Sequence, residues 1–273
     1  MSYYTTSSIV KMNDAKEGKE VITITWGDQA ENGVGMQQIG KLRAPGSGFT
    51  IEELEKIYNE HDIADIYYLN EPDVPGHANS GERAAVVVLR NGVDYMADME
   101  MHDDLFSEMK KLDYDKKKLI RGRVVNSHAR WNLCIDKQAQ TADLEQGKGT
   151  VVSYSQVPQL MSIADQFEIV FGDKARKLKG EINYYYDIDK CGIGFHGDAE
   201  RRIVIAVRLG ASLPLYYQWY RYGEAIGEVT EIPLNGGDIY IMSEKAVGTD
   251  WKRRNCATLR HAVGSSKYTK LHQ

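Results

Sequence analysis

Two short stretches in the second half of the chain carry residue types that can bind a metal ion. CGIGFHGDAERR (191–202) contains His196 and Asp198, and TLRHAVGSSKYTKL (258–271) contains His261. Residues i and i+2 of a strand point to one face, so His196 and Asp198 can share a metal for which His261 is the natural third ligand. Two imidazoles and one carboxylate on one side of an iron ion leave three positions open, which suits a bidentate 2-oxo acid plus O₂.

The elements that must position these residues are short strands. After residue 180, Gly, Pro or Asn separate strand-like runs about every ten residues, and these runs are INYYYD, RIVIAVRL, PLYYQWYRY, GEVTEIPL, DIYIM and TLRHAV. Such even spacing is typical of a sandwich, jelly roll or barrel. Upstream, the sequence predicts strands in 21–26 and 84–92, the second ending in an Asn-Gly turn, and helices in 50–61, 105–118 and 157–172. Thr50 and Glu53 form the capping-box pattern that begins the first helix.

Residues 150–271 resemble the iron(II)/2-oxoglutarate-dependent oxygenases, and within them the AlkB-like branch. NYYYDIDKCGIGFHGDAE is similar to that branch's pattern of Asn-x-Tyr, a short gap and His-x-Asp-x-(Asp/Glu), and LNGGDIYIMSEKAV is similar to its Gly-Asp strand before the distal His. The resemblance implies an α+β fold with a double-stranded β-helix (jelly-roll) core, and with N-terminal helices and extra strands packed outside it. It also implies an enzyme that oxidises an inert C–H bond with iron(II), 2-oxoglutarate and O₂, and that releases succinate and CO₂.

The resemblance assigns roles to the residues that match its motifs. His196, Asp198 and His261 match the iron ligands. Asn183 and Tyr185 match the Asn-x-Tyr pair that hydrogen-bonds 2-oxoglutarate.

The cation for the distal carboxylate of 2-oxoglutarate departs from the family pattern. Many AlkB-like proteins use an Arg beyond the distal His, whereas no Arg follows His261 here. Lys267 or Lys270 can serve as a point charge, although a lysine lacks the bidentate fork of arginine. Lys267 and Thr269, expected on one strand face, are the preferred pair, and Lys270 is the alternative.

Three residues are candidate contacts to the substrate. Glu200 stands two positions beyond the metal Asp, where AlkB-like enzymes can place an acid against the substrate base. Arg221 lies in YYQWYRY (216–222), whose rings either stack on a base beside this cation or fill the core and edge of a strand. Arg201 belongs to a further alternative, a local basic groove formed by Arg201, Arg202, Arg253 and Arg254.

The charge balance bears on the partner. The net charge is −5, and residues 1–150 hold 18 Lys and Arg against 25 Asp and Glu, while residues 151–273 hold 16 against 14. A typical high-affinity binder of duplex DNA is strongly basic, which this chain is not. The resemblance implies a modified or methylated nucleobase in DNA or RNA as the substrate, with single-stranded or modified nucleic acid as the partner. The alternatives are a protein side chain, as in prolyl or lysyl hydroxylases, a small molecule, and a non-catalytic jelly-roll binding module.

Two other clusters allow two interpretations each. MEMHDDLF (99–106) places His102 among acids, as in a second metal site or an HD-type hydrolase, or it is a solvated segment before a helix. SHARWNLC (127–134) offers Arg130 and Trp131 for substrate contact, or it buries Trp131 in the core.

The chain divides into a loose N-terminus (1–20), an extension of helices and strands that packs on the core (21–150), and a catalytic core (151–273). It has no run of about 18 apolar residues and no secretory signal. Cys134, Cys191 and Cys256 form no CxxC motif, which disfavours a disulfide framework and fits a reducing setting. We expect an intracellular protein, cytoplasmic or nuclear, with no membrane partner.

Overall fold

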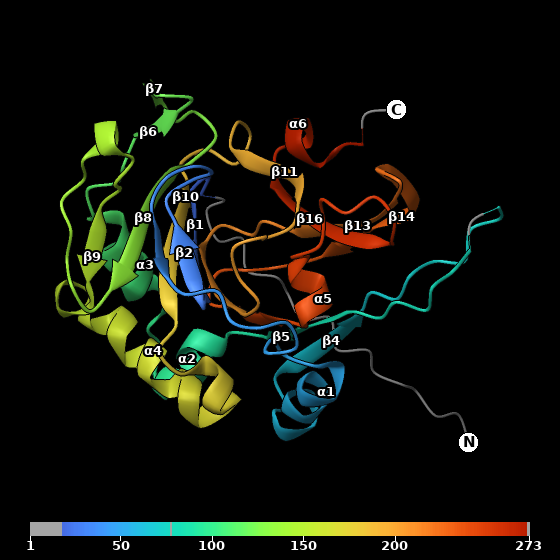
Figure 1. Cartoon of the computed structure of the whole chain (residues 1–273). Coiled ribbons are helices and arrows are strands. Elements are labelled where there is room, and N and C mark those ends of the chain that lie inside the picture. Colours follow the sequence, from blue (N-terminus) through green and yellow to red (C-terminus); the bar gives the residue numbers. More distant parts are fainter. Residues whose placement is uncertain (1–17, 77, 272–273) are drawn as a thin grey trace, which may run out of the picture.

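An eight-stranded sheet is the largest element of the fold in the computed structural model, which describes residues 18–76 and 78–271 (Figure 1). Its strands are β1 (Val21–Gly27), β4 (Ala64–Tyr68), β5 (Ala85–Leu89), β8 (Trp131–Asp136), β9 (Val151–Ser153), β10 (Lys179–Tyr185), β12 (Val204–Gly210) and β15 (Ile239–Met242). They lie in the order β4-β5-β15-β12-β1-β10-β8-β9, and only the pair β8–β9 is parallel. Strand β1, from the start of the chain, thus lies between β10 and β12.

A second sheet of four antiparallel strands faces the first. It contains β11 (Gly192–His196), β13 (Leu215–Arg221), β14 (Glu224–Ile232) and β16 (Thr258–Gly264), in the order β11-β16-β13-β14. Two small hairpins stand apart from both sheets: β2 (Gln29–Glu31) with β3 (Gln38–Gly40), and β6 (Lys117–Ile120) with β7 (Arg123–Asn126).

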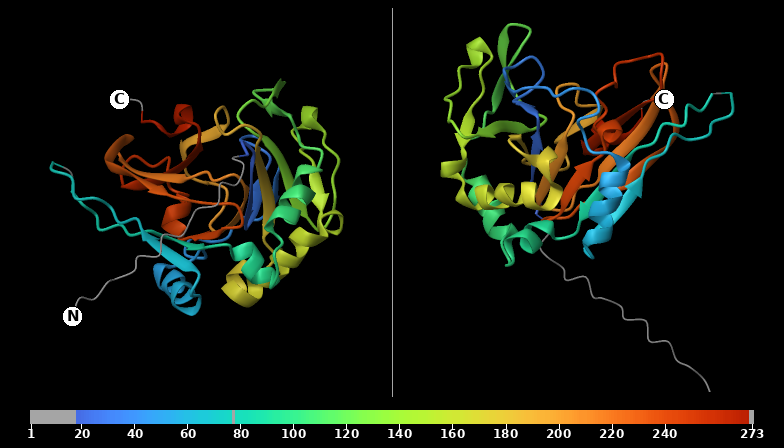
Figure 2. Two further views of the ribbon diagram at one scale, coloured as in Figure 1. Left: turned by 180° about the vertical axis from the view of Figure 1, so that it is seen from behind. Right: turned by 60° about the horizontal axis from the view of Figure 1, so that its bottom comes forward.

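The helices cover the outer face of the larger sheet. They are α1 (Ile51–Glu60), α2 (Gly92–Ala97), α3 (His102–Lys110) and α4 (Pro158–Phe171), while the short α5 (Glu244–Val247) and α6 (Ser266–Thr269) flank the smaller sheet. Ile24 of β1 packs with Leu105 and Phe167 in one core, and Val204 of β12 packs with Leu259 of β16 in the other. The layers are therefore helices, the large sheet and the small sheet, as both views from opposite sides show (Figures 1 and 2).

The structure confirms the mixed α+β class and most of the predicted elements. Strands occupy 21–27 and 85–89, helices occupy 51–60 and 158–171, and seven strands follow residue 178. Residues 21–150 supply β1, β4, β5 and β8 to the same sheet as β10, β12 and β15, so the large sheet is continuous across residue 150. Of the predicted loose N-terminus, residues 1–17 lie outside the described residues. No helix in the described part of the chain has the length and apolar character to cross a bilayer.

One local prediction was wrong, and a second was right only in part, because the turn at Arg90 and Asn91 leads into a helix. The helix expected over 105–118 is α3, which ends at Lys110, and residues 117–120 form β6. The lysines at 116–118 give a continued helix no apolar face, whereas Arg121 and Gly122, both with positive φ, form the two-residue turn that favours a hairpin. Asn91 and Gly92 begin α2 rather than a strand-to-strand turn.

The cap of α1 gives the first testable prediction. The Thr50 hydroxyl accepts a hydrogen bond from the Glu53 N–H (3.2 Å), and the Glu53 carboxylate accepts one from the Thr50 N–H (2.8 Å). Thr50→Ala should lower the free energy of unfolding by about 1 kcal/mol in urea titrations, because it leaves a helix N–H without its partner. Thr50→Ser keeps the hydroxyl and should remain close to the wild type; equal losses in both variants would show that the cap contributes nothing.

Candidate metal centre

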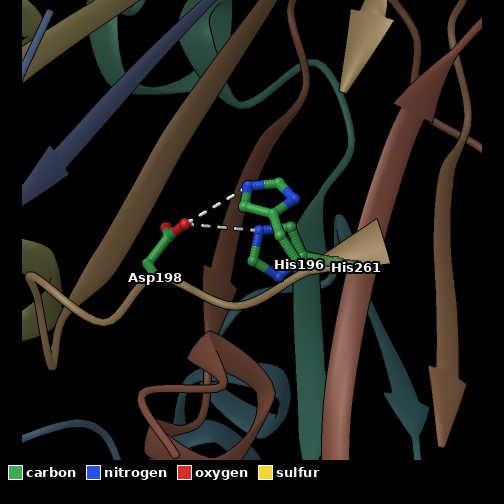
Figure 3. A group of neighbouring side chains, drawn as sticks. All are labelled: His196, Asp198 and His261. Atoms are coloured by element: carbon green, nitrogen blue, oxygen red, sulfur yellow. Dashed lines mark ion pairs between the residues drawn. The ribbon is translucent and has the colours of Figure 1, made fainter. Parts of the chain in front are cut away.

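Strand pairing brings the two distant histidines together. His196 at the end of β11 is the direct cross-strand partner of His261 in β16, and their ring centroids are 4.5 Å apart. Asp198 lies beyond the strand, in a loop whose backbone is fixed by the hydrogen bond from the Asp198 N–H to the Val247 carbonyl (2.9 Å). The three side chains converge as predicted, but the loop, rather than the alternation of a strand, directs Asp198 (Figure 3).

Gly197 makes this loop possible. A Cβ at Gly197 would lie 2.0 Å from the carbonyl oxygen of Gly248, so a larger residue cannot occupy the position without moving the backbone. The residue between His196 and Asp198 is thus held to glycine by the close approach of the segment after α5.

The spacing of the donor atoms fits one metal ion. Asp198 Oδ1 is 3.5 Å from His196 Nε2 and 3.6 Å from His261 Nε2. These distances are too long for good hydrogen bonds, and two ligands each about 2.1 Å from a shared ion lie at most about 4.2 Å apart. Within residues 18–76 and 78–271, this is the one group of three His, Cys, Asp or Glu side chains with such geometry.

The protonation states also suit a metal. His196 Nδ1 lies 2.8 Å from the Gly194 carbonyl, which can only accept, so Nδ1 carries the proton and Nε2 presents its lone pair. Burial, with the charge of His261, lowers the pKa of His196 to about 4, so the ring is neutral at neutral pH. Burial alone would raise the pKa of Asp198, but the Arg201 guanidinium holds it well below the usual range. Two imidazoles and one ionised carboxylate form a donor set that fits iron(II).

The three candidate ligands open into a cavity of about 550 Å³ between the two sheets. Asn183 and Tyr185, which alternate along β10, line this cavity together with Glu181. Asn183 Oδ1 accepts hydrogen bonds from Arg130 Nε (2.5 Å) and from the amide of Asn132 (2.7 Å). The Asn183 amide in turn donates to Glu181 (3.1 Å). The predicted Asn-x-Tyr pair therefore faces the candidate metal site, within a polar network.

The cavity contains a buried cation that the sequence patterns did not reveal. Arg208 of β12 is 1% exposed, donates one hydrogen bond to the Thr23 hydroxyl (2.7 Å), and leaves its buried Nε without a partner among the described residues. Burial raises the pKa of Tyr185 against the opposing charges of Arg130 and Arg208, and all three residues line the cavity. A buried guanidinium that forms no ion pair in the described chain is costly, and an anionic ligand in the cavity would offset that cost. The available signal was Arg208, the one charged residue inside the apolar run IVIAVRL (203–209).

The lysines predicted to bind the distal carboxylate of 2-oxoglutarate lie outside the cavity. Lys267 and Thr269 belong to helix α6 rather than to a strand, Lys267 and Lys270 are exposed, and none of the three lines the cavity. Strand β16 ends at Gly264, and the place beside β12 in the large sheet is already taken by β1. Among the described residues, the chain after Gly264 adds no strand to the large sheet.

Of the three residues predicted to contact the substrate, two lie at the cavity and one does not. Glu200 and Arg201 line the cavity, and burial, with the charges of Asp198 and Glu181, raises the pKa of Glu200 to about 7.

Arg221 does not reach the cavity. Its guanidinium pairs with Glu71 (2.5 Å) and Ser80 (2.8 Å) in the long arm between β4 and β5. Arg221 therefore lies outside the cavity and ties β13 to the arm, while its contact with a substrate stays a prediction. Figure 1 shows the arm extending away from β4 and β5.

Positive charge gathers on a segment that the sequence patterns did not single out. Residues 116–135 contain no Asp or Glu, and their cations are Lys116, Lys117, Lys118, Arg121, Arg123 and Arg130. This segment includes the β6–β7 hairpin, and its Lys118 and Arg130 line the cavity. The alternative of a basic groove formed by Arg201, Arg202, Arg253 and Arg254 was wrong for its first two members. Arg201 is buried among carboxylates, and Arg202 contacts Thr249 (2.7 Å) and Glu244 (3.6 Å), whereas Arg253 and Arg254 are exposed.

The alternative cluster around His102 has a structural role. Asp94 accepts hydrogen bonds from the backbone N–H groups of Met101 and His102 and contacts His102 Nδ1 at 2.7 Å. These contacts hold the start of α3. Trp131 is half-buried and stacks on Tyr186, with ring centroids 4.4 Å apart.

No model of a known protein family matches the chain. Among curated proteins, the chain is 45% identical over 258 residues to "Uncharacterized protein R156" of Acanthamoeba polyphaga mimivirus. The match spans 93% of this chain and 99% of the mimivirus protein.

Proposed function

We propose an enzymatic function for this chain, which belongs to the same family as the mimivirus protein. The chain is an iron(II)/2-oxoglutarate-dependent dioxygenase of the AlkB-like type. The observation that carries the proposal is one cavity that holds both a His-Asp-His group with metal-ligand spacing and a buried arginine, Arg208, without an ion pair among the described residues. Because the similarity spans nearly the whole of both chains, the proposal extends to the mimivirus relative.

The topology supports a jelly-roll core, a fold of eight strands in two sheets. From residue 179 onward, the strands are divided between the sheets: β10, β12 and β15 in the large one, and β11, β13, β14 and β16 in the small one. These are seven strands, and the eighth place, between β10 and β12, is filled by β1 in antiparallel pairing with both. We interpret the core as a double-stranded β-helix whose closing strand comes from the N-terminal side of the chain.

Different residues would bind the metal and the cosubstrate. His196, Asp198 and His261 would hold iron(II), which when bound supplies the O₂-dependent oxidation of a C–H bond coupled to conversion of 2-oxoglutarate to succinate and CO₂. Arg208 and the Tyr185 hydroxyl would bind the distal carboxylate of the cosubstrate, as a cation and a hydrogen-bond donor away from bulk water. Asn183, fixed by Arg130 and Asn132, would keep its remaining amide hydrogen for the same ligand.

The class is tested without a substrate. Iron(II) and 2-oxoglutarate, added anaerobically to the apoprotein, should produce a weak visible charge-transfer band only when both are present. Admission of O₂ should then yield slow, uncoupled succinate. A chain that binds both yet forms no succinate would be a binding module rather than an enzyme.

The basic segment supports single-stranded nucleic acid as the substrate. In a chain of net charge −5, six cations without one acid lie at 116–130, and two of them reach the wall of the cavity. The tip of the hairpin also exposes apolar side chains, among them Ile120 and Val124. Such a surface suits a phosphate backbone with bases laid over apolar groups, and one base could then enter the cavity.

Neutralising the hairpin tests this assignment. Replacing the exposed Lys117, Arg121 and Arg123 by Gln should weaken binding of a single-stranded oligonucleotide, and should reduce the slope of log K against log salt by roughly 0.7 for each phosphate that the protein no longer neutralises. The matched control is the Gln triple at Lys56, Lys111 and Lys137, which are exposed and lie outside the cavity wall. Equal effects of the two triples would remove the hairpin as the site. If the wild type binds no oligonucleotide, the protein or small-molecule substrate is favoured.

A further inference from the structure

We infer that Arg201 is a positioning residue that holds Asp198 in the orientation required for metal binding. The inference rests on the proposed metal centre, and it replaces the role in substrate contact that the sequence suggested for Arg201.

The two oxygens of Asp198 face different partners. Oδ1 is directed to the imidazoles of His196 and His261, at 3.5 and 3.6 Å. Oδ2 lies 3.7 Å from Arg201 Nε, whose own hydrogen bond goes to Glu200 (3.2 Å), so Arg201 acts on Asp198 through its charge. The guanidinium therefore attracts the oxygen that the histidines do not face. Oδ1 remains directed at the two imidazoles, as Figure 3 shows.

Arg201 is itself held from two directions. Its guanidinium forms ion pairs with Glu181 of β10 and with Glu200 (2.8 Å), and its side chain is 3% exposed. Glu181 also accepts the hydrogen bond from Asn183, so the clamp is continuous with the cavity wall on β10. The loop that carries Asp198 is thereby tied to the large sheet, while His196 and His261 belong to the small sheet.

The space around Arg201 is shaped for this side chain. A Cβ at Gly27, the last residue of β1, would lie 2.9 Å from Arg201 Cδ. Arg201 donates hydrogen bonds to Glu181 and Glu200 and lies within 4 Å of Asp198 as well. A lysine ammonium cannot reproduce this geometry, because it lacks the planar fork of arginine. Removal of a residue that contacts a metal ligand, rather than the metal itself, typically weakens metal affinity by roughly 10- to 100-fold.

The experiment measures metal binding by the apoprotein rather than turnover. Titration calorimetry with Mn(II) should give an affinity roughly 10- to 100-fold weaker for Arg201→Lys than for the wild type. The visible spectrum of bound Co(II) should change as well, because an unclamped carboxylate alters the coordination, which a purely structural role would leave as it is. Arg202→Lys is the matched control, since Arg202 is the next residue, half-buried, and contacts Thr249 and Glu244 instead of Asp198.

Glu181→Gln tests the clamp without touching Arg201. It should weaken metal binding in the same direction but less, and the double variant should bind metal no more weakly than Arg201→Lys alone, because Glu181 acts through Arg201. Thermal unfolding of each apoprotein checks that the comparison is made between folded chains. Unchanged metal affinity and an unchanged Co(II) spectrum in folded Arg201→Lys would overturn the inference. Failure of the wild type itself to bind Mn(II) or Co(II) would instead overturn the proposed metal centre.

Discussion

His196→Ala abolishes both metal binding and 2-oxoglutarate-dependent succinate formation, as we expect from its place in the site. The variant removes one of three donors, and the two that remain cannot hold the ion facially. Loss of a residue that contacts a metal ligand already weakens metal affinity by roughly 10- to 100-fold. Loss of a ligand itself should therefore weaken the affinity by more than about 100-fold. His261→Ala should have the same effect, because residues that act as one unit lose the function together rather than additively. Calorimetry with Mn(II) and a mass-spectrometric succinate assay measure the two effects.

His128→Ala is the control for this prediction. His128 is an exposed histidine whose side chain does not line the cavity, and its backbone carbonyl, which the substitution keeps, accepts the hydrogen bond from Tyr186. This variant should bind metal and form succinate like the wild type. Turnover that persists in folded His196→Ala would remove the assignment of the site, whatever the substrate proves to be.

The convergence of His196, Asp198 and His261 could be predicted from the sequence. His-x-Asp is a short motif, and the resemblance assigned the third position to His261, 65 residues further along the chain. The direct pairing of His196 with His261 across β11 and β16 supplies the reason that the two histidines meet. The short distance between Gly197 and Gly248, in contrast, depends on a packing contact that spacing cannot show.

The cation of the cavity could not be predicted in the same way. We expected it after His261, on one strand face with Thr269, whereas that segment forms α6 and β1 supplies the strand beside β12. Strand order is a long-range property: VITITW reads as a strand wherever it pairs. For the same reason the alternation of 216–222 could not show that the arm after β4 reaches over β13 and binds Arg221.

Arg208→Met should raise the KM for 2-oxoglutarate by roughly 10- to 100-fold, because a hydrogen bond to a charged group contributes about 1.5–3 kcal/mol and Met keeps the length of the side chain without its donors. Metal binding should be unaffected, which separates this variant from those of the ligands. Lys267→Met and Lys270→Met, at the exposed positions first considered for this role, should leave the KM unchanged. A raised KM in Lys267→Met together with an unchanged KM in Arg208→Met would show that Lys267, and not Arg208, binds the distal carboxylate.

Stability gives an independent measure of the same site. Without a ligand, Arg208 is a buried charge that has no ion pair within residues 18–76 and 78–271, so its replacement by Met should leave the melting temperature of the apoprotein equal or higher. Saturating 2-oxoglutarate should raise the melting temperature of the wild type, as expected for a ligand that binds only the folded state, and this increase should disappear in Arg208→Met. A destabilised apoprotein that still gains stability from 2-oxoglutarate would show that Arg208 supports the fold and that the cosubstrate binds elsewhere. We expect Arg208→Met to give a stable apoprotein whose melting temperature no longer rises with 2-oxoglutarate. This pair of results shows that the Arg208 guanidinium binds an anion, whereas a guanidinium that only packs in the core would give neither result.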